Sequence, residues 1–154
     1  MAISKKVLLA RPHSFIVAEM RPFLERTGYQ PSKLENIDDM YPGKLGQFNG
    51  AIISMAVVST IAAKPAEVFA ALRKSYPNLP VVFAGLTDFQ STMPSIERIV
   101  RALHPGAEIL PISSLAEAHP RLGAHDIFLF MNKDDITGAA GDGLAERILR
   151  RHFK

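Results

Sequence analysis

The sequence predicts one three-layer α/β domain whose doubly wound, mostly parallel sheet is covered by helices on both faces. Two observations support this prediction. Short apolar runs alternate with longer segments in which apolar residues recur every three or four positions, and the connections between them are short and contain Gly or Pro. The 154 residues suit a single domain, 1–154, and a hydrophobic content of 47% is sufficient for a substantial core.

The first half of the chain should hold three strands and two helices. Ser14 is placed to cap the first helix, Pro22 should kink it, and Gly28 should end it. The expected elements are a buried strand at 7–10, a helix at 14–26, a polar edge strand at 30–37, a short or irregular helix within 38–48, and an apolar central strand at 51–58.

The second half continues the alternation. Pro65 suits the first turn of a helix, and Pro94 is expected to begin another. The expected elements are a helix at 66–75, a strand at 81–84, a loop at 85–93, a helix at 94–103, strands at 108–112 and 127–131, a short helix or loop between these strands, and a closing helix at 143–153. The strand at 127–131 is expected either to join an edge of the sheet or to mediate dimerisation.

Four short runs carry a resemblance to a known family. They are Val7-Leu8-Leu9-Ala10 with its continuation to Gly28-Tyr29, the run from Phe48 to Ser54, the run from Tyr76 to Ala84, and Gly106-Ala107-Glu108. In their order and intervals, residues 5–115 resemble the receiver domain of two-component response regulators, and 116–154 would be a C-terminal extension. The resemblance implies a flavodoxin-like, receiver-like sheet of order 2-1-3-4-5 with an added strand and helix.

The positions that carry phosphorylation chemistry in receivers are all altered in this chain. Such domains hold a divalent cation with acids after the first strand and at the end of the third, where an Asp accepts the phosphoryl group. At the corresponding positions this sequence has Arg11, Pro12 and Ser54, with Gly85 at the switch hydroxyl and Ile112 near the fifth-strand Lys-Pro pair. The resemblance therefore implies a degenerate pseudo-receiver, not an enzyme, that is not phosphorylated in the usual way.

Such a domain is expected to act as a non-catalytic protein-interaction module in bacterial signal transduction. The partner would be another protein or a second copy of the chain. Receivers commonly communicate through their fourth helix, fifth strand and fifth helix. The resemblance therefore implies an interaction face at Ile96, Ile99, Arg101, Leu103 and Ile109.

The alternative is a sensor of small molecules or nucleotides, because ligands of open α/β sheets bind at the carboxyl ends of the strands. The candidate residues there are Arg11, His13, Ser54, Asn132 and Asp135, with Arg11 the candidate for an anion. Residues 132–135 match the Asn-Lys-x-Asp guanine-recognition motif, but the sequence has no phosphate-binding Gly-x-x-x-x-Gly-Lys-Ser/Thr loop. A polar turn is the other interpretation of that motif.

Composition also bears on cofactor binding, nucleic-acid binding and membrane association. The chain has no Cys, and its five His residues include no pair spaced by four, so neither a metal nor another cofactor is expected. A net charge of +3 without an aromatic stacking platform or a DNA-binding motif does not favour nucleic acid. The longest apolar stretch, 51–63, is too short for a bilayer, so we expect a cytoplasmic protein without a membrane partner.

Overall fold

The computed structural model describes residues 5–11, 13–34, 36–40, 48–55, 64–112, 119–132 and 144–153. These residues form a six-stranded, all-parallel sheet with helices on both faces, which confirms the predicted fold class. The strands are β1 (Lys5–Arg11), β2 (Tyr29–Lys33), β3 (Gly50–Ser54), β4 (Val81–Gly85), β5 (Glu108–Pro111) and β6 (Ile127–Asn132). The helices are α1 (Ser14–Thr27), α2 (Pro65–Ser75), α3 (Phe89–Arg101) and α5 (Leu144–His152), with a short 3-10 helix, η1 (Ile37–Met40).

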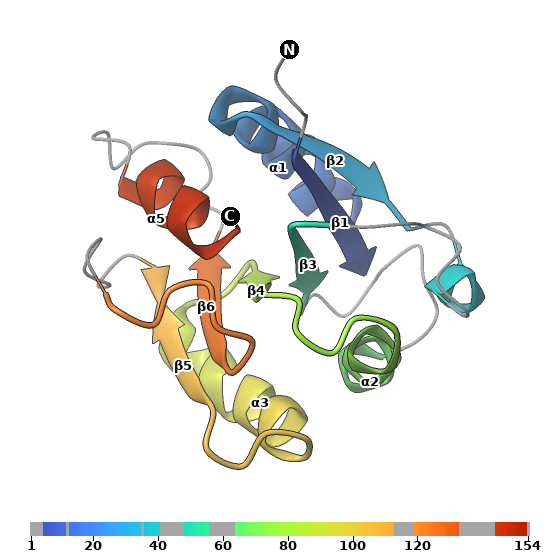
Figure 1. Cartoon of the computed structure of the whole chain (residues 1–154), viewed down its shortest axis with the longest axis vertical. Helices are drawn as coiled ribbons and strands as arrows, with labels where there is room; N and C mark the ends of the chain where they lie inside the picture. Colours follow the sequence, from blue (N-terminus) through green and yellow to red (C-terminus); the bar gives the residue numbers. More distant parts are fainter. Residues whose placement is uncertain are drawn as a thin grey trace.

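The strand order is β2-β1-β3-β4-β6-β5 (Figure 1). The first four positions follow the expected order, but β6 pairs with β4 and lies inside the sheet. The expectation that this strand joins an edge or mediates dimerisation was therefore wrong. The reason is burial: every residue of β6 from Ile127 to Met131 is buried, whereas β5 is partly exposed and ends in Pro111. A proline that cannot donate a backbone hydrogen bond is tolerated at a sheet edge, where β5 lies.

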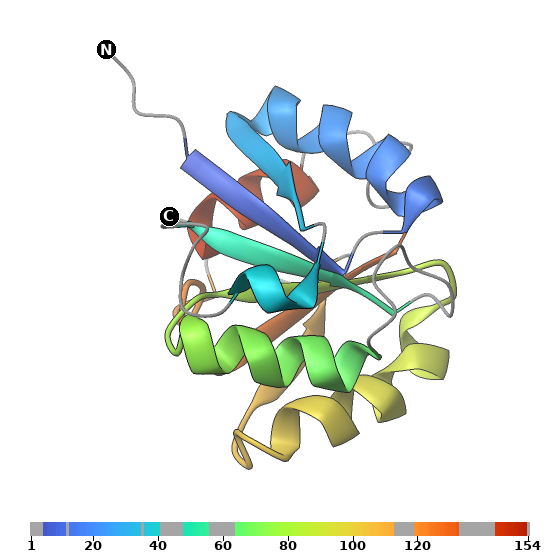
Figure 2. The same ribbon diagram turned by 90° about the vertical axis from the view of Figure 1, so that its right-hand side faces the viewer.

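Helices cover both faces of the sheet (Figure 2), and a hydrophobic core lies on each face. Side chains alternate along β1, so Val7 and Leu9 face one core while Leu8 and Ala10 face the other. The first core lies under α1 and α5, and the second under α2 and α3. Strands buried on both faces read as continuous apolar runs, which is why β3, β4 and β6 were recognisable in the sequence.

Helix α3 begins five residues earlier than predicted. The carboxylate of Asp88 accepts a hydrogen bond from the Ser91 backbone N–H at 2.8 Å and caps a helix that starts at Phe89. Pro94 therefore lies inside the helix instead of starting it, and the predicted loop at 85–93 was wrong beyond residue 88. In this added first turn, Phe89 and Met93 pack against the core under α2 and α3, and their burial favours the earlier start.

The second strand is shorter than expected and is followed by η1, and the remainder of the expected second helix, 41–47, lies outside the described residues. Among the helices that the structure describes, none has both the length and the apolar character needed to cross a bilayer.

The C-terminal helix is anchored through Tyr29. Its hydroxyl donates to the Phe153 carbonyl at 2.7 Å, and the two rings meet edge to face. Phe153 is fully buried, and its ring lies against the backbone of Gly50, where no side chain would fit. Glycine at the start of β3 is therefore what allows the end of the chain to close over the sheet.

Candidate functional site

Four of the predicted site residues end neighbouring strands. Arg11, Ser54, Gly85 and Asn132 are the last residues of β1, β3, β4 and β6, and because all strands are parallel these residues lie at one edge of the sheet. Ligands of open α/β sheets bind at this edge. The structure therefore brings together residues that are up to 121 positions apart, from Arg11 to Asn132.

A direct hydrogen bond joins the ends of β1 and β3. Arg11 Nη1 donates to the Ser54 backbone carbonyl at 2.9 Å. Leu9 pairs with Ile52 but Arg11 with Ile53, so β1 carries one extra residue, Ala10, at this point. Such a bulge re-aims the following side chain. The Arg11 side chain is buried, with 4% of the residue exposed, and burial lowers its pKa.

Ser54 is only 1% exposed, so its hydroxyl is buried. Ser54 therefore forms part of the floor of the strand-end region. The ends of β1 and β3 therefore hold a buried cation and a buried hydroxyl, and the cation donates to the backbone carbonyl of the residue that bears the hydroxyl.

Gly85 lies against aromatic carbon. A Cβ added at Gly85 would come within 3.1 Å of the Phe130 ring, closer than an ordinary packing contact. Beyond it, the hydroxyls of Thr87 and Thr92 share a hydrogen bond of 2.7 Å. The end of β4 is therefore a glycine packed under Phe130.

The expected fifth-strand position needs correction. Ile112 is 1% exposed and belongs to the core under α1 and α5, at the end of an edge strand. Because β6 is the strand next to β4, the residue that ends the neighbouring strand is Asn132, paired with Gly85. The sequence interpretation assigned this place to Ile112 because it assumed that strands pair in chain order.

The remaining predicted ligand-binding residues are less clearly placed. His13 is half-buried just after β1. Pro12 and Asp135 lie outside the described residues, so the Asn-Lys-x-Asp motif is described only at Asn132.

A cavity of about 540 Å³ opens beside Arg11 at this edge. Its other described lining residues come from the segment after β3, the start of α2 and the middle of α3: Met55, Lys64, Pro65, Ala66, Ser95, Arg98 and Ile99. Sequence analysis missed Lys64, Ser95 and Arg98. Pro65 did mark the start of α2, so Lys64 could have been placed at the strand-end edge, but Arg98 could not, because its place beside the cavity depends on how α3 packs against α2.

The predicted interaction face is only partly exposed. Ile96 is fully buried and Ile109 is 8% exposed, both in the core under α2 and α3, so these two predictions were wrong. Ile99 is half-buried, and only Arg101 and Leu103 are exposed, Leu103 at 49%. In α3 the row formed by Thr92, Ile96 and Val100 packs inward, and this row includes one of the residues predicted to face a partner.

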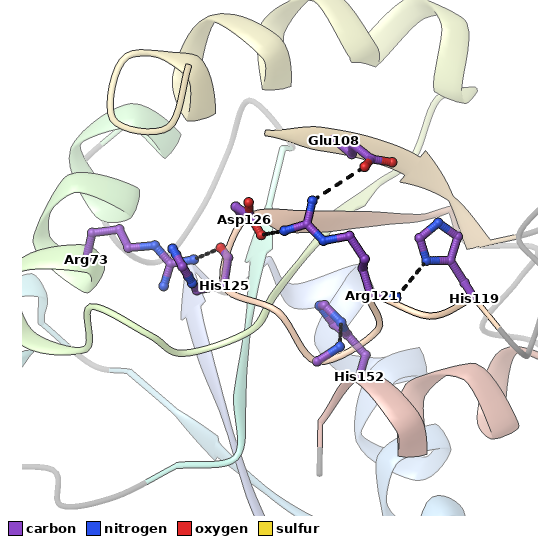
Figure 3. A network of polar contacts seen from close by, with 8 residues as sticks. Arg73, Glu108, His119, Arg121, His125, Asp126 and His152 are labelled. Atoms are coloured by element: carbon purple, nitrogen blue, oxygen red, sulfur yellow. Dashed lines mark hydrogen bonds and ion pairs between the residues drawn. The ribbon is translucent and has the colours of Figure 1, made fainter. Parts of the chain in front are cut away.

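A second polar network occupies the opposite edge, at the amino ends of the strands (Figure 3). Arg73 of α2 donates to the carbonyls of Leu79 and His125, at 2.6 and 2.5 Å, and its Nε donates to His104 Nε2 at 3.1 Å. Nearby, Arg121 forms ion pairs with Asp126 at 2.5 Å and Glu108 at 3.6 Å. The Arg73 bonds go largely to backbone carbonyls, so this network connects structural elements and was not apparent from sequence.

Comparison with known proteins places the fold. No protein-family model matches the chain, and no curated protein matches it in sequence. A solved structure, the crystal structure of a response regulator receiver protein from Sinorhizobium medicae WSM419, is similar with a TM-score of 0.54 and 11% sequence identity, over 96% of this chain and 97% of that one. At this identity the similarity concerns the fold alone, and the chain has a receiver-like fold.

Proposed function

We propose that this protein is a receiver-like signalling domain that acts by binding and does not accept a phosphoryl group in the usual way. The observation that carries the proposal is the hydrogen bond from Arg11 Nη1 to the Ser54 carbonyl. It places a buried positive charge between the ends of β1 and β3, where a receiver would gather carboxylates.

The electrostatic consequence supports the proposal. Phosphoryl transfer to a receiver needs a divalent cation that neutralises the charge on the phosphoryl oxygens. A buried guanidinium at the same place repels that cation, and low surrounding polarity strengthens the repulsion. The Ser54 hydroxyl is buried and has no carboxylate charge with which to replace an acceptor Asp.

The proposed role is protein interaction in bacterial signal transduction, in the cytoplasm. The contact surface would be the exposed end of α3 and the residues that follow it, Arg101 and Leu103. Leu103 is a large apolar side chain with half of its surface in water, beside a charged residue. The partner would be another signalling protein, with a second copy of this chain as the other candidate.

The test is a nuclear magnetic resonance titration of the isotope-labelled protein with Mg²⁺ and beryllofluoride, followed by Mg²⁺ and acetyl phosphate. We expect no Mg²⁺-dependent shift in the amide signals of Arg11, Ser54 and Gly85, while a receiver with intact acids, run in parallel, responds. Shifts at these strand ends that need Mg²⁺ would show that phosphorylation chemistry survives and would overturn the proposal.

The second candidate function is a small-molecule or nucleotide sensor that binds at the carboxyl ends of the strands. The cavity beside Arg11 favours it, because its volume of about 540 Å³ falls within the range of small-molecule sites. Binding there could alter the packing of α3, which contributes to the cavity and to the proposed contact surface.

A further inference from the structure

The cavity beside Arg11 is lined by positive charges from three separate elements. Arg11 ends β1, Lys64 precedes α2, and Arg98 lies on α3. The described lining residues include no Asp or Glu. An anion bound in this concave space would be attracted by all three cations.

Helix α2 adds to the positive field. Its first residue, Pro65, and its second, Ala66, line the cavity, so the helix directs its N-terminus toward this space. The N-terminus of an 11-residue helix has a partial positive charge and favours a bound anion. Glu67 offsets part of this field, since its exposed carboxylate accepts a hydrogen bond from the Lys64 backbone N–H at 3.3 Å.

The guanidinium of Arg11 is held in place before any ligand arrives. It is buried, and its Nη1 donates to the Ser54 carbonyl. Arg98 is also oriented, since its Nη2 donates to the Ser95 hydroxyl at 3.3 Å. Arginines that are already ordered lose less conformational entropy when they bind an anion, and their planar donors match phosphate oxygens.

Apart from Ser95, the rest of the described lining is apolar. Met55, Pro65 and Ile99 contribute carbon surface between the charged groups. A free inorganic ion would not use this surface, whereas an organic molecule bearing an anionic group would. An extended nucleic acid would instead need a basic groove that tracks its backbone, not a concave space of about 540 Å³.

From this geometry we propose that the cavity lined by Arg11, Lys64 and Arg98 binds a small organic phosphate, with its phosphate among the three cations and its carbon skeleton against Met55 and Ile99. The proposal deepens the sensor function and rests on it. Such a site works without a metal ion, because protein cations supply the charge that Mg²⁺ supplies in a receiver.

The experiment measures binding to the full chain by amide and arginine side-chain nuclear magnetic resonance, in EDTA. The probes are inorganic phosphate and phenyl phosphate, with sodium chloride at matched ionic strength and phenol as controls. We expect both phosphates to shift the signals of Met55, Ala66 and the Arg98 side chain. Phenyl phosphate should bind several-fold more tightly, because it also contacts the apolar wall.

Matched variants distinguish binding at this site from a general effect of the protein's positive charge. Lys64→Gln and Arg98→Gln remove exposed cations of the lining, and each should weaken phenyl phosphate binding about tenfold, as expected for a charge-assisted hydrogen bond. Lys74→Gln makes the same change near the far end of α2 and should leave the affinity unchanged. Equal affinity in all three variants, or shifts reproduced by chloride, would overturn the proposal.

The outcomes also show whether the anion site alone fails or whether the proposal that phosphorylation chemistry is lost fails with it. Absence of phosphate binding in EDTA would refute the anion site and leave the proposed interaction module intact. A response that appears only with Mg²⁺ would instead contradict both, since it would require acids at the strand ends. Equal binding of phosphate and phenyl phosphate would contradict the organic ligand.

Discussion

Arg73 Nη2 donates to the His125 backbone carbonyl at 2.5 Å and thereby ties the end of α2 to the segment that leads into β6. Nη1 of the same residue donates to the Leu79 carbonyl at 2.6 Å, just before β4. The guanidinium lies 5.4 and 5.6 Å from the ring centroids of Phe69 and Phe128. One side chain therefore connects the starts of two neighbouring central strands, which helps to hold β6 beside β4.

We predict that Arg73→Met lowers the free energy of unfolding by about 3 kcal/mol, because buried carbonyls would lose a charged donor. The measurement is urea unfolding monitored by circular dichroism. Arg101→Met is the matched control on α3: its exposed pair with Glu97 should contribute less than about 0.5 kcal/mol. Similar unfolding midpoints for the two variants would show that Arg73 does not stabilise the fold by connecting these strands.

We predict that the buried side chain of His152 makes the folded protein less stable in acid. Burial lowers its pKa to about 4, the positive charge of Arg73 adds to that effect, and a hydrogen bond to the Val81 carbonyl opposes it. Nδ1 accepts a hydrogen bond from the Gly123 N–H at 3.1 Å, so the folded protein requires the neutral imidazole. The unfolded chain takes up a proton below its ordinary pKa of 6.5, so stability is complete above this value and falls as the pH drops toward 4.

The expected loss for His152 over this window is roughly 3 kcal/mol. His104, whose pKa is lowered by burial and then by Arg73 and His125, acts in the same direction. The check is a set of urea midpoints measured across this window for the native protein and His152→Gln. The variant should show a flatter dependence on pH, and parallel curves would count against the assignment.

We predict that the buried hydroxyl of Tyr29 makes the folded protein less stable in alkali. Burial raises the pKa of its phenol to about 12, although the nearby charge of Arg150 acts in the opposite direction. The folded state therefore favours the neutral hydroxyl, and its contribution to stability is lost as the pH rises from 10 toward 12. Tyr29→Phe should cost about 1 kcal/mol at neutral pH, because the Phe153 carbonyl loses its donor.

The tyrosinate absorbance that the native protein has in excess of Tyr29→Phe reports Tyr29 itself, and it should develop near pH 12 instead of near pH 10. Above pH 10 the variant should also lose less further stability than the native protein does. If the two proteins lose stability equally in alkali, the Tyr29 hydroxyl does not anchor the C-terminal segment.

The close contact between Gly50 and Phe153 leads to a prediction about the effect of a larger side chain on stability. A Cβ at this position would overlap the Phe153 ring, so Gly50→Ala should destabilise the protein by about 1–3 kcal/mol. Gly106→Ala is the matched control, since nothing lies within 4 Å of its added Cβ, and it should be near neutral. Thermal unfolding of both variants provides the comparison. In a Phe153→Leu background the cost of Gly50→Ala should shrink, and an undiminished cost would mean that the overlap is not with Phe153.

Local sequence patterns were sufficient for most elements. The apolar runs around Ile52, Val82 and Leu129 predicted β3, β4 and β6, because strands buried on both faces need apolar side chains at every position. Boundaries were less accurate where two local signals competed. At the start of α3, the Asp88 cap and Pro94 are both helix signals, and only the structure shows that the cap prevails.

The strand-end chemistry was predictable in part. The resemblance to receivers placed Arg11 and Ser54 at the carboxyl ends of their strands, where the structure also has them. The apolar run alone predicted a third strand at 51–58, whereas β3 ends at Ser54. Their hydrogen bond could not be predicted, because it depends on a one-residue irregularity in the pairing of β1 with β3. Lys64 and Arg98 reach the same cavity only because α2 and α3 pack side by side on one face.

The sequence by itself determined the alternation of strands and helices, the parallel sheet and the residue types, such as Arg11 and Ser54, that end the strands. These features depend on residue type and spacing along the chain. Tertiary structure alone decided that β6 lies between β4 and β5, that Ile96 and Ile109 face inward, and that three distant cations surround one cavity. Such outcomes depend on which of several compatible long-range packings buries the most apolar surface with its polar groups satisfied, and no local pattern encodes that comparison.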